Sequence, residues 1–146
     1  MKFAVSKYQV PPNLCLFDAN SKDDRKKFND VIGIYAIVYK NQIIYVGQSR
    51  QIGKRIAAHM SQTALERILK RKEKYDNIKG DKYPQCFGFQ IEFYKFIQTH
   101  RNNIKFCILK ECAIEQLNHK EELFINKYHP KFNYAGNVSH FVPIKH

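Results

Sequence analysis

The amino-acid sequence predicts an α+β fold in which a small three-stranded antiparallel sheet is flanked by helices. Two short runs of β-branched and aromatic residues follow one another closely and a third comes much later, which is typical of strands. Between and after them, apolar residues recur at helical spacing. At 146 residues, 44% of them hydrophobic, a single domain is expected. We place this domain at residues 32–134, with a basic helical insertion at about 62–103, between an N-terminal extension (1–31) and a C-terminal tail (135–146).

The N-terminal extension is expected to lack regular structure, and the first two strands follow it as a hairpin. Pro11 and Pro12 block a helix or a central strand. Residues 34–39 form a run rich in β-branched and aromatic side chains, and residues 43–46 resume the strand pattern after a short polar break at 41–42. Two strands with so few residues between them pair in antiparallel fashion.

A helix is expected to follow the hairpin and to run to about Met60. Ser49 is a suitable residue for its N-terminal cap. Ile52, Ile56 and Met60 recur every four residues. Because residues four apart share one face of a helix, these three residues predict its buried stripe.

A second helix, strongly basic, is expected next. Thr63 and Glu66 have the spacing of a capping box. Leu65, Ile68 and Leu69 fall together on one face of this helix. The opposite face would carry basic side chains, namely Arg67, Lys70, Arg71, Lys72 and Lys74.

The second half of the chain predicts one more strand between two helices. Residues 87–97 fit both a strand and a helix. We choose the helix, because residues 101–103 then turn the chain into an unambiguous strand at 104–109. A final helix is expected at about 114–128, and Pro130 would end it. Its inward side chains are expected to be Leu117, Phe124 and Ile125.

The composition indicates a polyanionic partner. The formal net charge is +12 and the isoelectric point is about 9.6, which favours nucleic acid over a membrane surface. The longest apolar runs span only a few residues, so we expect no membrane-spanning segment and a cytoplasmic protein. The four cysteines form no Cys-x-x-Cys pair and lie within or beside apolar stretches. Buried thiols are therefore expected in preference to a zinc site.

Four residues with side chains suited to catalysis lie in the hairpin and in the helix expected after it. Tyr35 and Tyr45 lie ten residues apart on adjacent strands, and Arg55 follows ten residues later. His59 is four residues beyond Arg55, so the two share one face of the expected helix. Cleavage of a phosphodiester requires such groups: a base for the nucleophile, a cation for developing charge and donors for the phosphate.

The sequence around these residues resembles the GIY-YIG nuclease superfamily. Residues 33–35 read Gly-Ile-Tyr, and residues 45–47 supply the second motif as Tyr-Val-Gly. Residues 47–49 and 104–112 look closer to the phage and homing-endonuclease branch than to excision-repair subunits. Five elements in order at family spacing make this resemblance specific. The elements that match the family's closing helix and terminal asparagine are 121–125, Tyr128, Pro130 and Asn133.

The resemblance implies a GIY-YIG-like fold and a catalytic role for each residue of the constellation. Tyr35 would activate or place the attacking water, with His59 assisting. Tyr45 would bond to the phosphate or to the water network. Arg55 would bind the phosphate and stabilise the charge of the transition state.

The resemblance also implies a metal ion and a reaction. Glu121 would hold one divalent cation per active site, Mg²⁺ or Mn²⁺, against the scissile phosphate. Asn133 would tie the closing turn of the chain to the wall of the active site. The implied activity is that of a free-standing, metal-dependent endodeoxyribonuclease of phage or restriction type, acting inside a bacterial or phage-infected cell.

Double-stranded DNA is the implied partner. Only 13 residues follow Asn133, so we expect the middle of the chain, not a separate C-terminal region, to contact it. A homodimer assembled on DNA would bring two single active sites to the two strands. Two alternatives stay open, a nucleic-acid-binding module without catalysis and an RNA-directed nuclease. The residues expected to contact DNA are Arg50, Lys54, Arg67, Lys70, Arg71, Lys72 and Lys74.

Overall fold

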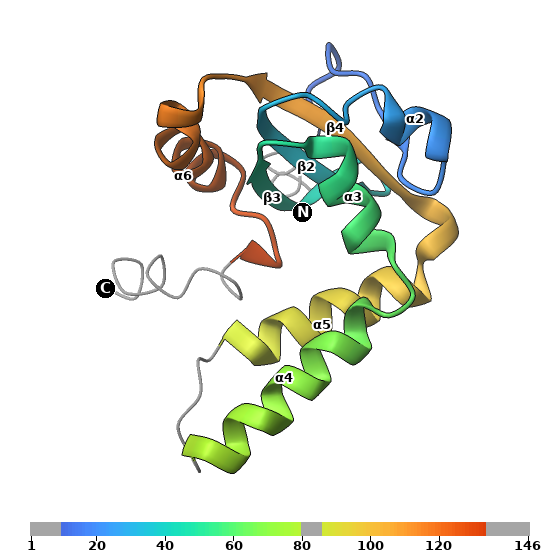
Figure 1. Ribbon diagram of the computed structural model, residues 1–146. Helices are drawn as coiled ribbons and strands as arrows, with labels where there is room; N and C mark the ends of the chain where they lie inside the picture. Colours follow the sequence, from blue (N-terminus) through green and yellow to red (C-terminus); the bar gives the residue numbers. More distant parts are fainter. Residues whose placement is uncertain (1–9, 80–85, 134–146) are drawn as a thin grey trace, which may run out of the picture.

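A four-stranded antiparallel sheet forms the centre of the computed structural model, which describes residues 10–79 and 86–133 (Figure 1). The α+β class is confirmed, but the expected count of three strands is wrong. In sequence order the strands are β1 (Phe17–Asp18), β2 (Gly33–Tyr39), β3 (Gln42–Ser49) and β4 (Ile104–Glu111). In space the order is β1-β4-β2-β3, so the long strand β4 lies between β1 and β2.

The additional strand belongs to the segment that was expected to lack regular structure. Phe17 in β1 pairs with Phe106 in β4, and the ring of Phe28 packs at 4.9 Å from that of Phe17 and at 5.7 Å from that of Phe106. A short helix, α2 (Lys22–Lys26), follows β1 and is capped by Ser21. A two-residue strand is too short to show the alternation by which strands are recognised in a sequence. Aromatic packing across almost ninety residues of sequence fixes its position instead.

The β2–β3 hairpin turns one residue earlier than predicted. Lys40 and Asn41 both have positive φ angles, 49° and 63°, which is the geometry of the two-residue turn that matches the twist of a hairpin. Gln42 is already part of β3. Asparagine tolerates a positive φ well, which explains why the turn is centred on the Lys-Asn pair.

Helices cover both faces of the sheet, so the side chains of β2 are buried on both sides. On one face, Ile34, Ala36 and Val38 pack against α6 (Leu117–Tyr128), which a short 3-10 turn (Ile114–Gln116) precedes. On the other face, Tyr35 and Ile37 pack against α3 (Ile52–Met60) and α5 (Cys86–Thr99). The burial of Ile52, Ile56 and Met60 confirms the predicted stripe of α3.

Two predicted details of the helices are wrong. The residue that caps α3 is Gln51, and Ser49 ends β3, where its hydroxyl accepts a hydrogen bond from the Gln51 amide. In α4 (Ala64–Lys79) the buried residues of the first turns are Ala64 and Ile68, whereas Leu69 is 44% exposed. The buried face of α4 therefore contains Ala64 and not Leu69.

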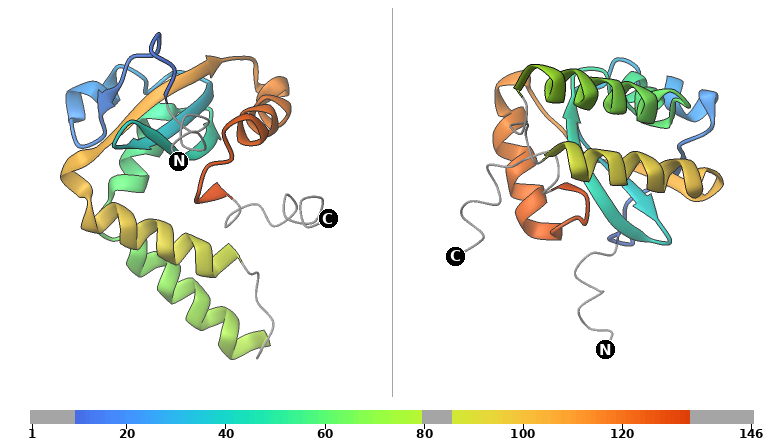
Figure 2. Two further views of the ribbon diagram at one scale, coloured as in Figure 1. Left: turned by 180° about the vertical axis from the view of Figure 1, so that it is seen from behind. Right: turned by 90° about the horizontal axis from the view of Figure 1, so that it is seen from below.

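The helices α4 and α5 form a hairpin that extends away from the sheet, as two opposite views show (Figure 1 and Figure 2, left). The helical interpretation of residues 87–97 is thereby confirmed. A single 3-10 turn (Arg101–Asn103) then leads into β4. The final helix ends at His129, which has a φ of 48°, immediately before Pro130, as predicted.

The cysteine prediction is right in part. Cys107 is buried in the core, Cys112 is partly buried and Cys15 is exposed, whereas the side chain of Cys86 lies outside the described part of the structure. No helix within the described ranges has the length and apolar character that crossing a membrane requires.

Candidate active site

Tyr35 is held in the core by the glycine opposite it on the neighbouring strand. Tyr35 in β2 pairs with Gly47 in β3. A β-carbon on Gly47 would lie only 2.5 Å from the Tyr35 hydroxyl oxygen and 2.6 Å from the adjoining ring carbon. The tyrosine ring therefore occupies the space that a side chain at position 47 would take, and Tyr35 is fully buried.

The hydroxyl of Tyr35 is the first link in a buried chain of hydrogen bonds. It lies 2.7 Å from Nε2 of His59, and Nδ1 of His59 lies 3.1 Å from the hydroxyl of Tyr94. Burial, helped by the nearby charge of Arg55, lowers the pKa of His59 to about 3. His59 is therefore neutral at pH 7, with one nitrogen that donates and one that accepts. Such a chain can pass a proton between its two phenols through the imidazole.

Tyr45 and Arg55 stand between this chain and the surface. The ring of Tyr45 stacks on Phe93 at 4.8 Å and meets His59 edge-on at 5.4 Å. The Arg55 side chain is exposed, and its charge acts on the hydroxyls of both Tyr35 and Tyr45. Burial nevertheless raises the pKa of Tyr45 to about 12, and burial together with Tyr45 raises the pKa of Tyr35 well above 10. Both phenols therefore keep their protons at neutral pH.

A small cavity lies at this point of the fold. Its volume is about 40 Å³, which is enough for an ordered water molecule, since one needs about 10–15 Å³. Polar atoms from several side chains surround it, as an ordered water requires. The cavity is lined by Tyr45, Arg55, His59, Gln90, Phe93, Tyr94 and Phe132.

Glu121 reaches the same region from the far end of the chain. Its side chain on α6 is partly buried, whereas that of Glu122 is exposed. The Glu121 carboxylate accepts a hydrogen bond of 2.9 Å from Gln48 at the end of β3, and its negative charge contributes to the raised pKa of Tyr45. Within the described part of the chain, no group of three or more His, Cys, Asp or Glu side chains is placed to hold a metal ion. Glu121 thus offers a single carboxylate next to the tyrosines.

Asn133 fastens the last described turn to β3. Its side chain is 1% exposed. The amide oxygen accepts a bond of 2.6 Å from the Val46 nitrogen, and the amide nitrogen donates a bond of 2.7 Å to the Val46 carbonyl. One side chain thereby satisfies both backbone groups of the residue between Tyr45 and Gly47.

The basic residues predicted from the sequence lie on two helices and the segment before them, and they differ in exposure. Arg50 and Lys54 are exposed at the start of α3, and α4 carries the others. Lys72 is the one partly buried member of this set; the exposed members on α4 are Arg67, Lys70, Arg71 and Lys74.

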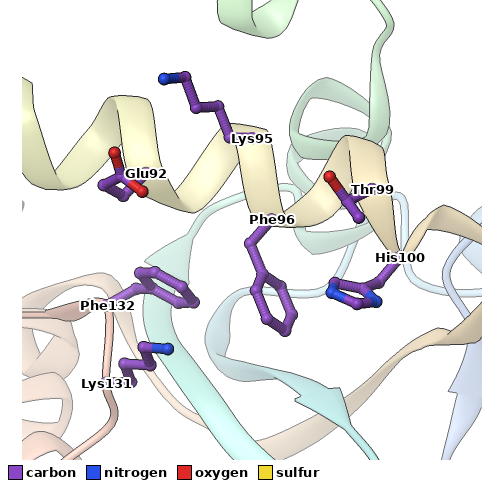
Figure 3. A pocket seen from close by; sticks show the side chains of 7 residues that line it. All are labelled: Glu92, Lys95, Phe96, Thr99, His100, Lys131 and Phe132. Carbon is purple, nitrogen blue, oxygen red and sulfur yellow. The ribbon is translucent and has the colours of Figure 1, made fainter.

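A larger, aromatic pocket lies on another side of α5 (Figure 3). It measures about 420 Å³, and Phe96, His100 and Phe132 point into it, with Lys95 and Lys131 at its rim. Phe132 also lines the small cavity beside Tyr45. Phe132 therefore forms part of the wall of both hollows.

Sequence reasoning missed the polar partners of the catalytic candidates. Tyr94 completes the hydrogen-bond chain of His59, and Gln48 holds Glu121. Tyr94 stands next to Phe93 on a helix that was recognised only by its apolar residues, so no local pattern marks it. Gln48 lies within the matching strand motif, directly after Gly47, and this position is the signal that could have identified it.

Comparison of the chain with protein-family models, with curated proteins and with solved structures found no match in any of the three.

Proposed function

We propose that this protein is a metal-dependent DNA endonuclease that hydrolyses a phosphodiester bond. The observation that carries the proposal is the meeting of Tyr35, Tyr45, Arg55 and His59 with Glu121, which lies more than sixty residues further along the chain. A buried proton acceptor and an exposed cation at one small cavity, with a carboxylate whose charge acts on Tyr45, are the groups that such a reaction uses.

Arg55 and Tyr45 would engage the substrate first. The exposed guanidinium of Arg55 can bind a phosphate through two parallel hydrogen bonds and stabilise the charge that grows during attack. The Tyr45 hydroxyl stays protonated, because the pKa of this group is raised to about 12. It therefore acts as a hydrogen-bond donor to the phosphate or as a partner that orients the attacking water.

Tyr35 and His59 would manage the proton. As the water oxygen attacks phosphorus, its proton would pass to the Tyr35 oxygen while the Tyr35 hydroxyl proton passes to Nε2 of His59, 2.7 Å away. Because Tyr35 is fully buried and does not line the small cavity, this transfer requires the site to open around the bound phosphate. With a His59 pKa of about 3, the imidazolium costs about 5 kcal/mol at pH 7. The negative phosphate must offset this cost, so substrate binding itself prepares the base. The leaving oxygen takes a proton from solvent, and His59 then returns its extra proton to solvent through a phenol of the hydrogen-bond chain, which balances the reaction and restores the neutral imidazole.

Glu121 fits the metal requirement that the family resemblance implies. Mg²⁺ is commonly held by one or two carboxylates together with substrate phosphates and waters, and Glu121 is a partly buried carboxylate fixed by Gln48. Mg²⁺ or Mn²⁺, one ion per site, would supply Lewis-acid polarisation of the phosphate there. Gln48 would orient the carboxylate, as outer partners of metal ligands usually do.

Double-stranded DNA is the proposed substrate, because the net charge of +12 favours a polyanion and the basic helix α4 lies on the hairpin that projects from the sheet (Figure 1). One active site per chain suits a nick, and a pair of chains assembled on the duplex would suit a double-strand break.

Plasmid cleavage tests the proposal. Supercoiled plasmid is incubated with Mg²⁺ and the wild-type chain, Tyr35→Phe, Glu121→Ala or the matched control Glu122→Ala. We expect nicked or linear product from the wild type and from Glu122→Ala, and none from the other two, while duplex binding persists in all four. Binding without cleavage by the wild type would instead indicate a nucleic-acid-binding module. Preferential cleavage of an RNA duplex run in parallel would indicate an RNA-directed nuclease.

A further inference from the structure

A second cavity lies where α3, α4 and α5 meet and adjoins the one beside Tyr45, with which it shares Arg55, Gln90 and Tyr94. It measures about 170 Å³. Three arginines from two helices line it: Arg55 from α3, and Arg67 and Arg71 from α4, which are four residues apart and so share a face. Tyr94 and Gln90 approach it from α5.

The positive charge in this cavity is not paired with a carboxylate of the described residues. Among the side chains that the structure describes, the salt bridge found is between Lys27 and Asp24, on and beside α2. The three arginines act together at one point, because each of them lowers the pKa of Tyr94, against the larger effect of burial, which raises it. Guanidinium groups so placed repel one another until an anion lies between them.

Gln90 presents an unpaired hydrogen-bond acceptor at this cavity. Its side-chain oxygen is buried and has no hydrogen-bond partner among the described residues. Buried polar atoms in native proteins are almost always bonded. This oxygen is an acceptor, so the hydroxyl group of a hydrogen phosphate ion would satisfy it directly, and beside a phosphodiester an ordered water would have to do so.

We propose that this cavity binds a phosphate group, and that in the DNA complex it takes the phosphate adjacent to the one that is cleaved. The second clause rests on the proposed nuclease function, whereas the first does not. Arg55 lines both cavities, so it can bridge two neighbouring phosphates of one strand. The planar fork of arginine fits phosphate oxygens better than a lysine ammonium does, and Arg67 is steadied by a hydrogen bond to the Thr63 hydroxyl.

The proposal divides the basic residues of α4 into two functional groups. Arg67 and Arg71 line the cavity, whereas Lys70 and Lys74 are exposed and do not line it. Two double variants therefore remove the same charge from the same helix: Arg67→Gln with Arg71→Gln, and Lys70→Gln with Lys74→Gln. A general electrostatic effect would treat these two variants alike.

The test is a titration of the full chain with inorganic phosphate at constant ionic strength. Binding is monitored through the arginine Nε–H signals in NMR spectra. We expect saturable shifts of a few arginine signals in the wild type and in the lysine double variant, and at least tenfold weaker affinity in the arginine double variant. Arg71→Lys keeps the charge but not the fork, and should bind with intermediate affinity. Equal weakening in both double variants, or shifts that never saturate, would overturn the proposal.

The outcome is independent of catalysis. Tyr35→Phe should bind phosphate as the wild type does, since Tyr35 does not line this cavity. A wild type that binds phosphate but leaves plasmid intact would refute the nuclease function and retain the site. A wild type that cleaves plasmid but shows no saturable phosphate binding would retain the function and refute the site.

Discussion

Replacement of Asn133 tests how the last described turn is held against the active-site strand. Asn133→Ala removes both bonds to Val46, whose side chain is fully buried. A buried backbone group left without a partner costs about 1–3 kcal/mol. Two such groups lower the free energy of unfolding by about 2–6 kcal/mol, with water at the sheet edge favouring the lower part of that range. This loss is a large share of the stability of an ordinary domain, about 5–15 kcal/mol.

Urea-induced unfolding, followed by circular dichroism, measures this loss. Asn126→Ala, at an exposed position of α6, is the matched control and should stay within about 0.5 kcal/mol of the wild type. A change below that limit for Asn133→Ala as well would refute the reasoning, because the turn would then be held by something other than the two bonds.

Asn133→Asp tests the same contact through the pH dependence of stability, whose direction can be predicted. One carboxylate oxygen can still accept from the Val46 nitrogen, but the other faces the Val46 carbonyl, so the pKa of the new carboxyl rises in the folded state. Stability from a raised pKa is fully present below the unfolded pKa of about 3.9 and is lost as the pH rises through the folded value. At each pH the free energy of unfolding of Asn133→Asp is compared with that of the wild type. The difference between them should therefore be smaller at pH 4 than at pH 7.

Three further predictions follow from the site. Burial lowers the pKa of His59 to about 3, so the free energy of unfolding should fall by up to about 1.4 kcal/mol per pH unit below pH 6.5. In urea titrations from pH 7 to pH 4, His59→Gln should remove the His59 contribution to this dependence of stability on pH. Gly47→Ala should displace the Tyr35 ring, destabilise the fold by about 1–3 kcal/mol through overpacking and reduce plasmid cleavage; unchanged unfolding would show that the ring has room to move. The Lys70→Gln and Lys74→Gln pair should weaken duplex binding at every sequence and reduce its log–log salt slope by about 0.9 for each phosphate that the protein no longer neutralises, and an unchanged slope in filter-binding assays would place the DNA elsewhere.

Periodicity predicted the elements whose packing is local and repetitive. The spacing of Ile52, Ile56 and Met60 identified α3, and the β-branched run after residue 103 identified β4. Elements fixed by distant contacts escaped prediction. Phe17 belongs to a strand only because Phe106 lies beside it, and no window around Phe17 carries that information.

The site was predictable to the extent that strand pairing and helix phase bring its residues together. Register places Tyr35 opposite Gly47, and the phase of α3 places Arg55 and His59 on related faces. The complete burial of Tyr35 and the bond from His59 to Tyr94 depend on how α5 packs on the sheet. This packing is a tertiary property that no spacing within the chain encodes.

The closed edges of the sheet affect how this protein behaves at high concentration. Along the outer edge of β3, the backbone nitrogen of Phe132 donates a hydrogen bond to the carbonyl of Ile44, and the Asn133 side chain bonds both backbone groups of Val46. These backbone groups of β3 are therefore not free to pair with another strand. At the other edge β1 covers part of β4, and the stretch beyond it exposes Lys110 and Glu111. Free, uncharged strand edges are the templates on which chains add to one another in amyloid-like aggregates. Proteolytic loss of the short β1 segment would therefore uncover backbone groups of β4 and should raise the tendency of the chain to aggregate.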